Sequence, residues 1–310
     1  MKEVFVPRHF QYKTRETIAD AVAIIEEYQN EGFNLTVRQL YYQFVTRELI
    51  PNKQAEYDRL GAIINNARLA GLIDWDAIED RTRQVRSRTH WESPIDIIAG
   101  ARRSFHKDLW EGQLWRLEVW IEKDALLGVI ASICHRYDVP YFSCRGYVSQ
   151  SEMYQAAKRF KEYELEGAIP VIIHLGDHDP SGIDMTRDII ERISLFTGIP
   201  IYEDADSDDA AIHRIALNMD QVESLNLPPN PAKEADSRYA SYISKYGASS
   251  WELDALDPKY LERLLKETFD RFVDVDLKKQ VEAEIRKGKA HLFKVEQNWD
   301  QVVQFVKDLD

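Results

Sequence analysis

The stretch IPVIIHLGDHDPSG (residues 169–182) decides the fold of this chain. Its first seven residues are almost entirely apolar, as expected for a strand that is buried on both faces of a parallel sheet. Gly176 and Gly182 then mark a sharp turn. A second stretch of the same kind, LWRLEVWIEKDAL (residues 114–126), lies upstream. Both stretches place acidic residues directly after a strand.

Strands and helices alternate around these two stretches. Further strands are expected at 139–144 and 199–203, with helices over residues 126–137, 152–164 and 183–196. Such alternation is typical of parallel β-α-β units. We therefore predict an α/β fold in residues 113–310, with a four-stranded, Rossmann-like parallel sheet and a C-terminal helical extension.

Residues 1–112 predict a separate, helical domain. Apolar side chains recur at helical spacing over residues 16–30, and another helix is expected over residues 54–70. Between them a helix is expected to start at Thr36, whose spacing to Gln39 fits a capping box. A short segment of alternating residues from Leu72 to Arg83 fits a wing. Three helices and a hairpin predict a winged-helix DNA-binding domain. The alternative is a helical domain that binds nothing, because helices of similar length occur in many such domains.

The composition excludes several classes of protein. The 310 residues contain 44% hydrophobic and 30% charged residues and only two cysteines. No apolar run is long enough to span a membrane, and the cysteines are too few for a disulfide framework or a four-cysteine zinc site. The first ten residues lack the apolar core of a secretory signal. We expect a protein of the reducing cytoplasm with no membrane segment.

The net charge of −13 is unevenly distributed. Residues 1–116 contain 17 Lys+Arg and 17 Asp+Glu, so the excess of acid lies in the rest of the chain. Within residues 81–107 basic side chains exceed acidic ones by five. This segment and the third helix are the expected contacts to nucleic acid, through Arg59, Arg68, Arg81, Arg83, Arg86 and Arg88. The alternative is an ordinary solvated face.

The acidic residues after the strands suggest a metal site. If the two strands are neighbours, Glu122, Asp177 and Asp179 converge at the carboxyl edge of the sheet. Three carboxylates repel one another unless a cation lies among them, and Mg²⁺, or Mn²⁺, suits oxygen ligands. The alternative is a pair of acids that merely shape a tight turn. His174 is expected to pack within the strand, and His178 to face phosphate or solvent.

The second predicted helix, TVRQLYYQFV (residues 36–45), contains a candidate nucleophile. Tyr42 lies one helical turn after Arg38, on the same face. A phenol ordinarily titrates near pH 10 and is a poor nucleophile at neutral pH. A guanidinium and a metal-bound phosphate favour the phenolate, so this pair predicts attack on a DNA phosphate. The alternative is a tyrosine that is buried for packing alone.

These motifs resemble a known family. IEKDAL (121–126) and GDHDPSGIDM (176–185) are similar to the acidic motifs of the Toprim domain in the topoisomerase VI A subunit and its relative, the meiotic double-strand-break protein. RQLYY (38–42) resembles their winged-helix motif, in which an arginine precedes two aromatic residues. The resemblance implies that Glu122, Asp177 and Asp179 bind Mg²⁺, and that Tyr42 cleaves DNA with the assistance of Arg38 and Glu122. It is closest to small free-standing bacterial A-like proteins.

The resemblance implies topoisomerase-like DNA cleavage by a homodimer. No phosphate-binding motif for ATP is present, so an ATPase subunit would be a separate partner chain. Two alternatives stay open. The chain is a Toprim nuclease that uses metal-activated water while Tyr42 is structural, or it is a non-enzymatic DNA-binding subunit.

Overall fold

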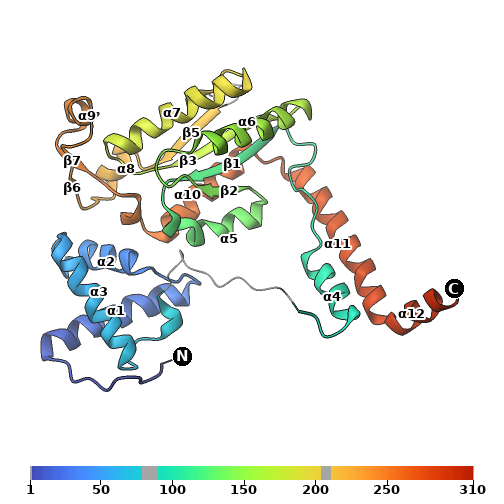
Figure 1. The fold of residues 1–310 in the computed structure, drawn as a ribbon, viewed down its shortest axis with the longest axis horizontal. Helices are drawn as coiled ribbons and strands as arrows, with labels where there is room; N and C mark the ends of the chain where they lie inside the picture. Colours follow the sequence, from blue (N-terminus) through green and yellow to red (C-terminus); the bar gives the residue numbers. More distant parts are fainter. Residues whose placement is uncertain (1, 79–89, 204–210, 310) are drawn as a thin grey trace.

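A computed structural model describes residues 2–78, 90–203 and 211–309 (Figure 1). The chain forms an α/β body, a group of N-terminal helices beneath one end of it, and a helical arm that projects from the other end. The arm brings α4 (Pro94–Ser104) alongside α11 (Val275–Gln297), which are far apart in the sequence.

The body is built on a five-stranded parallel sheet, which confirms the predicted α/β class. The strands are β1 (Trp115–Ile121), β2 (Tyr141–Ser143), β3 (Ile169–Leu175), β4 (Tyr202–Glu203) and β5 (Ala211–Ala216), in the order β2-β1-β3-β5-β4. β1 and β3 pair along their whole length, from Trp115 opposite Ile169 to Ile121 opposite Leu175. The two strands that end in acidic residues are therefore neighbours.

The prediction of four strands was wrong, because β5 was missed. Its sequence, AIHRIA, contains His213 and Arg214, which the sequence pattern marks as polar. Both side chains are nevertheless buried, and β5 pairs with β3 and β4. The strand expected at 199–203 is also shorter, since only Tyr202–Glu203 pairs with β5.

Helices cover both faces of the sheet, so the body has three layers. On one face, Val119 and Ile121 pack with α5 (Leu127–Tyr137) and α10 (Pro258–Phe272). On the other face, Trp120 and Ile172 pack with α6 (Gln150–Leu165) and α7 (Pro180–Thr197). This alternation along β1 follows from the period of two of an extended strand.

The N-terminal helices form as the sequence predicts. They are α1 (Tyr12–Asn30), α2 (Val37–Thr46) and α3 (Gln54–Leu69), and Thr36 and Gln39 make the expected capping box at the start of α2. Residues 72–78 of the expected wing contain a short 3₁₀ helix, η1 (Trp75–Ala77), and the end of that wing, residues 79–83, lies outside the described residues.

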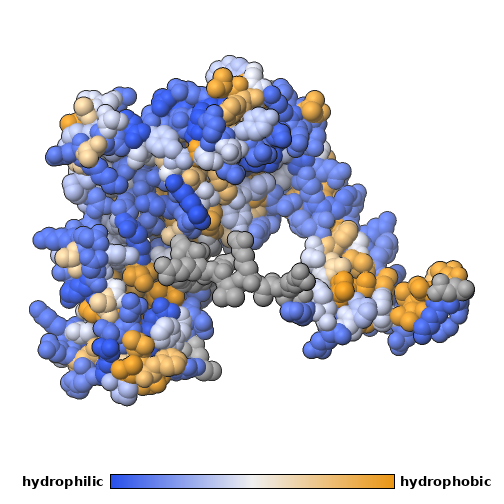
Figure 2. Space-filling model, in the orientation of Figure 1, coloured by the Kyte–Doolittle hydropathy of each residue, from blue (hydrophilic) through white to orange (hydrophobic). Residues whose placement is uncertain are grey.

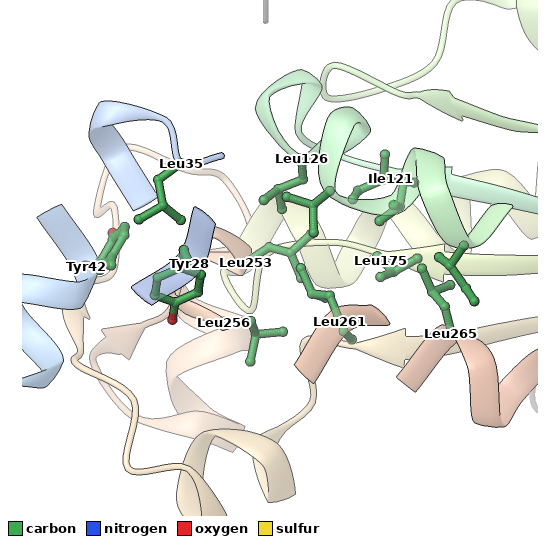
Figure 3. Packing of buried hydrophobic residues seen from close by; sticks show 14 of the residues in the cluster. Tyr28, Leu35, Tyr42, Ile121, Leu126, Leu175, Leu253, Leu256, Leu261 and Leu265 are labelled. Atoms are coloured by element: carbon green, nitrogen blue, oxygen red, sulfur yellow. The ribbon is translucent and has the colours of Figure 1, made fainter. Parts of the chain in front are cut away.

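One continuous hydrophobic core joins the N-terminal helices to the body. Figure 3 shows Leu253 and Leu256 lying between Tyr28 and Leu35 on one side and Leu126 on the other. Leu253 belongs to a 3₁₀ helix, η3 (Leu253–Ala255), that packs against α2. A side-chain hydrogen bond from Tyr28 to Asp257 adds to this contact. The segment before α10 therefore connects the two parts.

The chain between β5 and α10 forms several small elements. They are α8 (Met219–Ser224), β6 (Asn230–Pro231), α9 (Tyr239–Tyr246) and β7 (Ser249–Ser250), and β6 pairs antiparallel with β7. Sequence analysis did not anticipate this two-stranded sheet. It places Asn230 close to α2 and leads directly into η3.

The arm ends in α12 (Trp299–Lys307) and carries exposed apolar side chains. Phe293, Phe305 and Leu309 are 47%, 65% and 69% exposed, and Figure 2 shows hydrophobic patches over this region. Within the arm Arg102 pairs with Glu296 at 2.7 Å, so part of the basic segment 81–107 is neutralised by α11. In the described part of the chain, no helix has the length and apolar character needed to cross a bilayer.

Candidate functional site

Glu122 and Asp177 meet at the carboxyl edge of the sheet because β1 and β3 are neighbours. The backbone N–H of Asp177 donates to Oε2 of Glu122 at 2.7 Å, and the N–H of Glu122 donates to the carbonyl of Leu175 at 2.8 Å. Gly176 lies directly under the Glu122 carboxylate, since a Cβ there would lie 3.2 Å from Oε2.

Asp179 begins α7. Its Oδ1 accepts hydrogen bonds from the N–H of Gly182 at 2.7 Å and from the hydroxyl of Ser181 at 2.9 Å, as an N-cap residue does. Gly182 has no room for a side chain, because a Cβ would lie 2.2 Å from the carbonyl oxygen of Asp177. The turn from β3 into α7 is therefore tight, and it holds both aspartates in fixed positions.

The buried side chain of Arg214 holds this turn from inside. Its guanidinium donates to the carbonyls of Asp177 at 2.7 Å, Gly182 at 2.9 Å and Gly176 at 3.0 Å. Buried backbone groups without partners are costly, so these bonds stabilise the turn; the carbonyl of Gly176 also accepts from the N–H of Leu217 at 2.7 Å. Arg214, whose polar character is the reason that β5 was not predicted, thus holds the acidic turn in place.

Lys123 lies among three carboxylates. Its Nζ is 2.8 Å from Oδ2 of Asp177, 3.3 Å from Oε2 of Glu252 and 3.6 Å from Oδ2 of Asp254. The other oxygen of Asp177 accepts the N–H of Leu253 at 2.8 Å. The η3 segment is therefore bound directly to the acidic edge of the sheet.

Burial and mutual repulsion shift the ionisation of these acids. Burial raises the pKa of Glu122, and the nearby Asp179 carboxylate raises it further. Burial raises the pKa of Asp177 to about 7, with repulsion from Glu122 adding to the shift and Lys123 opposing it. Burial also raises the pKa of Asp254. The protonated forms of these carboxyl groups are therefore favoured, because the nearby cations offset burial and repulsion only in part.

Arg38, one helical turn before Tyr42, contacts the same short segment around η3 that contacts Lys123 and Asp177. Arg38 forms an ion pair with Glu252, and its Nε is 3.5 Å from Oδ2 of Asp254. The guanidinium carbon lies 5.9 Å from the centre of the Tyr42 ring. Tyr42 is 3% exposed and lines a pocket of about 390 Å³. Burial and the Glu252 carboxylate raise its pKa, while Asn230 and Arg38 act in the opposite direction.

The predicted DNA-contacting arginines have different surroundings. Arg59 on α3 is exposed and pairs with Glu56 at 2.5 Å. Arg68 donates to the carbonyl of Trp75 at 2.6 Å and lies over its ring, so its guanidinium holds the turn after α3. The remaining four lie outside the described residues: Arg81, Arg83, Arg86 and Arg88.

The position of His174 agrees with the prediction, and that of His178 does not. His174 is buried in β3 and its Nδ1 lies 3.0 Å from the hydroxyl of Thr186. The expectation that His178 faces phosphate or solvent was wrong. It is 2% exposed, and its Nδ1 lies 2.8 Å from the hydroxyl of Tyr242, because the following segment folds over it and pairs with its backbone through Trp251.

Sequence reasoning missed several residues that surround the site. They are Lys123, Arg214, Asn230, Glu252 and Asp254. One signal was available for two of them: SSWELDAL (249–256) contains two acids among apolar residues just before a helix. Arg214 and Asn230 gave no such signal, because their contacts depend on chain pairing across long sequence separations.

The donor types at this edge suit a hard divalent cation. Five carboxyl groups (Glu122, Asp177, Asp179, Glu252, Asp254) gather here with three cationic side chains (Lys123, Arg38, Arg214). The formal excess is two negative charges when every carboxyl group is ionised. Oδ1 of Asp254 is buried without a hydrogen-bond partner. Within residues 2–78, 90–203 and 211–309, however, no three acidic, histidine or cysteine side chains are arranged to hold a metal ion. Asp177 and Asp179 instead bind donors of their own chain.

Comparison with known proteins does not assign the chain to a family. No family model matches it, and no curated protein matches it.

Proposed function

We propose that this protein is a Mg²⁺-dependent, DNA-binding and DNA-cleaving protein of the topoisomerase VI A-subunit type. One observation carries the proposal: the acidic edge of the sheet and the tyrosine-bearing helix are connected through Arg38, Glu252, Lys123 and Asp177. A sheet edge rich in carboxylates next to a tyrosine–arginine pair is the arrangement that the sequence motifs imply.

Glu122, Asp177 and Asp179 are the residues proposed to hold Mg²⁺, or Mn²⁺ in its place. The bound cation would supply positive charge beside the phosphate oxygens. The chain's own part is to hold the turn that carries the two aspartates, through Arg214 and the capping contacts of Asp179. Lys123 neutralises Asp177 in the arrangement described here.

Tyr42 is proposed to act as the nucleophile. Its phenolic oxygen attacks the phosphorus of a DNA phosphodiester and loses its proton, forming a tyrosyl phosphate. The bond from phosphorus to the leaving sugar oxygen breaks, and that oxygen takes up a proton. Arg38, held by Glu252, supplies the positive charge that favours the phenolate.

The N-terminal helices are proposed to act as a winged-helix DNA-binding module in a cytoplasmic homodimer. The three helices and the exposed Arg59 on α3 support the module. Exposed apolar side chains on the arm support association with a second chain. Two buried, unpaired cysteines suit a reducing compartment. An ATPase partner chain is part of the proposal only by resemblance.

A second candidate is a hydrolytic nuclease that uses metal-activated water. The observation that favours it is the burial of Tyr42, which raises the pKa of the phenol and disfavours the attacking phenolate. In that case the tyrosine would pack between α2 and the body and would take no part in the reaction.

The test is incubation of the protein with supercoiled DNA and Mg²⁺ or Mn²⁺, stopped with detergent and divided for protease treatment. Breaks that carry bound protein and that are lost in Tyr42→Phe and in Asp177→Ala support the tyrosine mechanism. Breaks with free ends that survive in Tyr42→Phe favour the hydrolytic nuclease. Binding without any breaks contradicts both.

A further inference from the structure

Tyr42 lines a pocket that two parts of the chain build together. Arg38 and Tyr57 line it from the N-terminal helices, and Asn230 and Glu252 line it from the body. Asn230 lies in β6, and its side-chain amide donates to the Tyr42 hydroxyl at 3.4 Å. The body thus contributes a polar group to the proposed nucleophile.

The direction of this hydrogen bond is determined by a chain of partners that starts at the backbone. The hydroxyl of Tyr41 accepts from the N–H of Lys53 at 2.8 Å, and its acceptors are Oδ1 of Asn52 at 2.9 Å and the carbonyl of Lys53 at 3.2 Å. The carbonyl of Pro229 can only accept, so the amide nitrogen of Asn52 faces it and the amide oxygen faces Tyr41. That nitrogen donates to Oδ1 of Asn230 at 3.0 Å and to the carbonyl of Pro229 at 2.9 Å.

Asn230 is therefore left with its amide nitrogen facing Tyr42. The Asn230 oxygen already accepts from Asn52, and only the nitrogen end reaches the phenol. A phenol oxygen that accepts this bond directs its own hydrogen elsewhere. In the part of the chain that is described, no hydrogen-bond acceptor is found for that hydrogen, and the pocket is the open side.

The bond also acts on the charge of the phenol. A donor aimed at an oxygen stabilises the oxygen more when it is negative. Arg38 acts in the same sense, while Glu252 and burial oppose it and raise the pKa of Tyr42. Asn230 is thus a neutral group that favours the phenolate where desolvation disfavours it.

We propose that Asn230 is a positioning residue for Tyr42. Its amide, oriented by Asn52 and the carbonyl of Pro229, directs the phenol O–H toward the pocket and stabilises the phenolate. This inference rests on the proposed role of Tyr42 as nucleophile. The alternative role for Asn230 is purely structural, as a tie between β6 and the N-terminal helices.

Asn230→Asp separates the two roles. An aspartate still accepts from Asn52, so the structural tie is kept, but it presents an acceptor and a negative charge to Tyr42. Under single-turnover conditions with Mg²⁺ and a DNA duplex, we expect covalent adduct formation to slow by at least about tenfold, with DNA affinity unchanged. Asn298→Asp, which makes the same charge change on the arm, should match the wild type.

Asn52→Asp tests the same idea without altering Asn230. The new carboxylate has no donor for Asn230, so the Asn230 amide turns its nitrogen toward it and its oxygen toward Tyr42. The adduct should form more slowly here as well. As a readout independent of catalysis, the ¹³Cζ resonance of Tyr42 should move in both variants and stay in place in Asn298→Asp.

The outcomes distinguish this inference from the proposed function. Adducts that form at the wild-type rate in Asn230→Asp and Asn52→Asp, with an unmoved Tyr42 resonance, overturn the inference and leave Tyr42 as the nucleophile. Absence of adducts in the wild-type protein overturns the proposed function and this inference with it.

Discussion

Arg38 and Lys123 bind the same carboxylate, that of Glu252. Arg38 lies one turn before Tyr42 on α2, and Lys123 follows Glu122 at the end of β1. Glu252 pairs with the first and lies 3.3 Å from the Nζ of the second. The short segment before α10 therefore connects two groups that the sequence places 85 positions apart.

Removing the charge of Glu252 should separate these groups. Glu252→Gln leaves Arg38 and Lys123 with Asp254 and Asp177 alone. We expect DNA cleavage to fall by about tenfold because the two groups are no longer held together, even though the lost charge had raised the pKa of Tyr42. Stability should change by no more than about 1 kcal/mol, because the pair is partly exposed. Single-turnover cleavage and urea unfolding measure the two effects. Glu262→Gln, which removes the partner of the exposed Arg136, is the matched control. Equal cleavage rates in both variants would contradict the linking role.

Arg214 should be essential for the acidic turn. Arg214→Met keeps a long apolar side chain but removes the donors for the carbonyls of Gly176, Asp177 and Gly182. Loss of several buried hydrogen bonds should cost roughly 3 kcal/mol or more of unfolding free energy. Urea denaturation is the measurement. Arg136→Met, at an exposed site, should cost little, and a similar small loss in Arg214→Met would refute the assignment.

Gly182 should tolerate no side chain. In Gly182→Ala the new Cβ would meet the carbonyl oxygen of Asp177, so the turn must open, and we expect a loss of about 1–3 kcal/mol. Gly61→Ala is the control, since Gly61 lies within α3 and a Cβ there makes only an ordinary contact with Val37 at 3.8 Å. That variant should be stabilised by about 0.5–1 kcal/mol. Thermal unfolding of both variants measures these changes in stability. A Gly182→Ala variant that is as stable as the wild type would contradict the prediction.

The pH dependence of stability should reflect Asp177. Its pKa in the folded protein is raised to about 7, so the folded state binds more protons than the unfolded state between about pH 4 and 7. Stability contributed by this group therefore falls as the pH rises through that range. His178, whose pKa burial lowers to about 4, acts in the opposite direction, so the variant must be compared with the wild type.

Asp177→Asn isolates this effect. Without divalent cations, the unfolding free energy of the variant relative to the wild type should increase from pH 4 to pH 7. Urea titrations at several pH values measure the difference. Parallel curves would show that folding does not raise the pKa of Asp177.

The sequence was most informative where local patterns dominate. The capping box at Thr36 and Gln39 and the long apolar strand before Gly176 follow from neighbouring residues alone. The sequence predicted that Glu122 and Asp177 meet if their strands are neighbours, because the carboxyl ends of parallel strands lie at one edge of a sheet. The pairing of β1 with β3 fulfils that condition.

The rest depended on partners that no local pattern reveals. β5 was missed because Arg214 reads as polar, although its buried guanidinium satisfies carbonyls from another segment. Asn230 gave no signal, since its partners Asn52 and Tyr42 lie more than 170 residues away in the chain. The burial of His178 likewise depends on the distant Tyr242 and Trp251.

The most direct test of the central claim is to identify the residue that becomes attached to DNA. After reaction with duplex DNA and Mg²⁺, nuclease and trypsin digestion should yield the peptide of residues 39–47 carrying a nucleotide, and fragmentation should place it on Tyr42. Tyr41, whose hydroxyl donates to Asn52, should stay unmodified. The modified peptide should be absent from Glu122→Gln. DNA breaks with no nucleotide on this peptide, persisting in Tyr42→Phe, would contradict the claim.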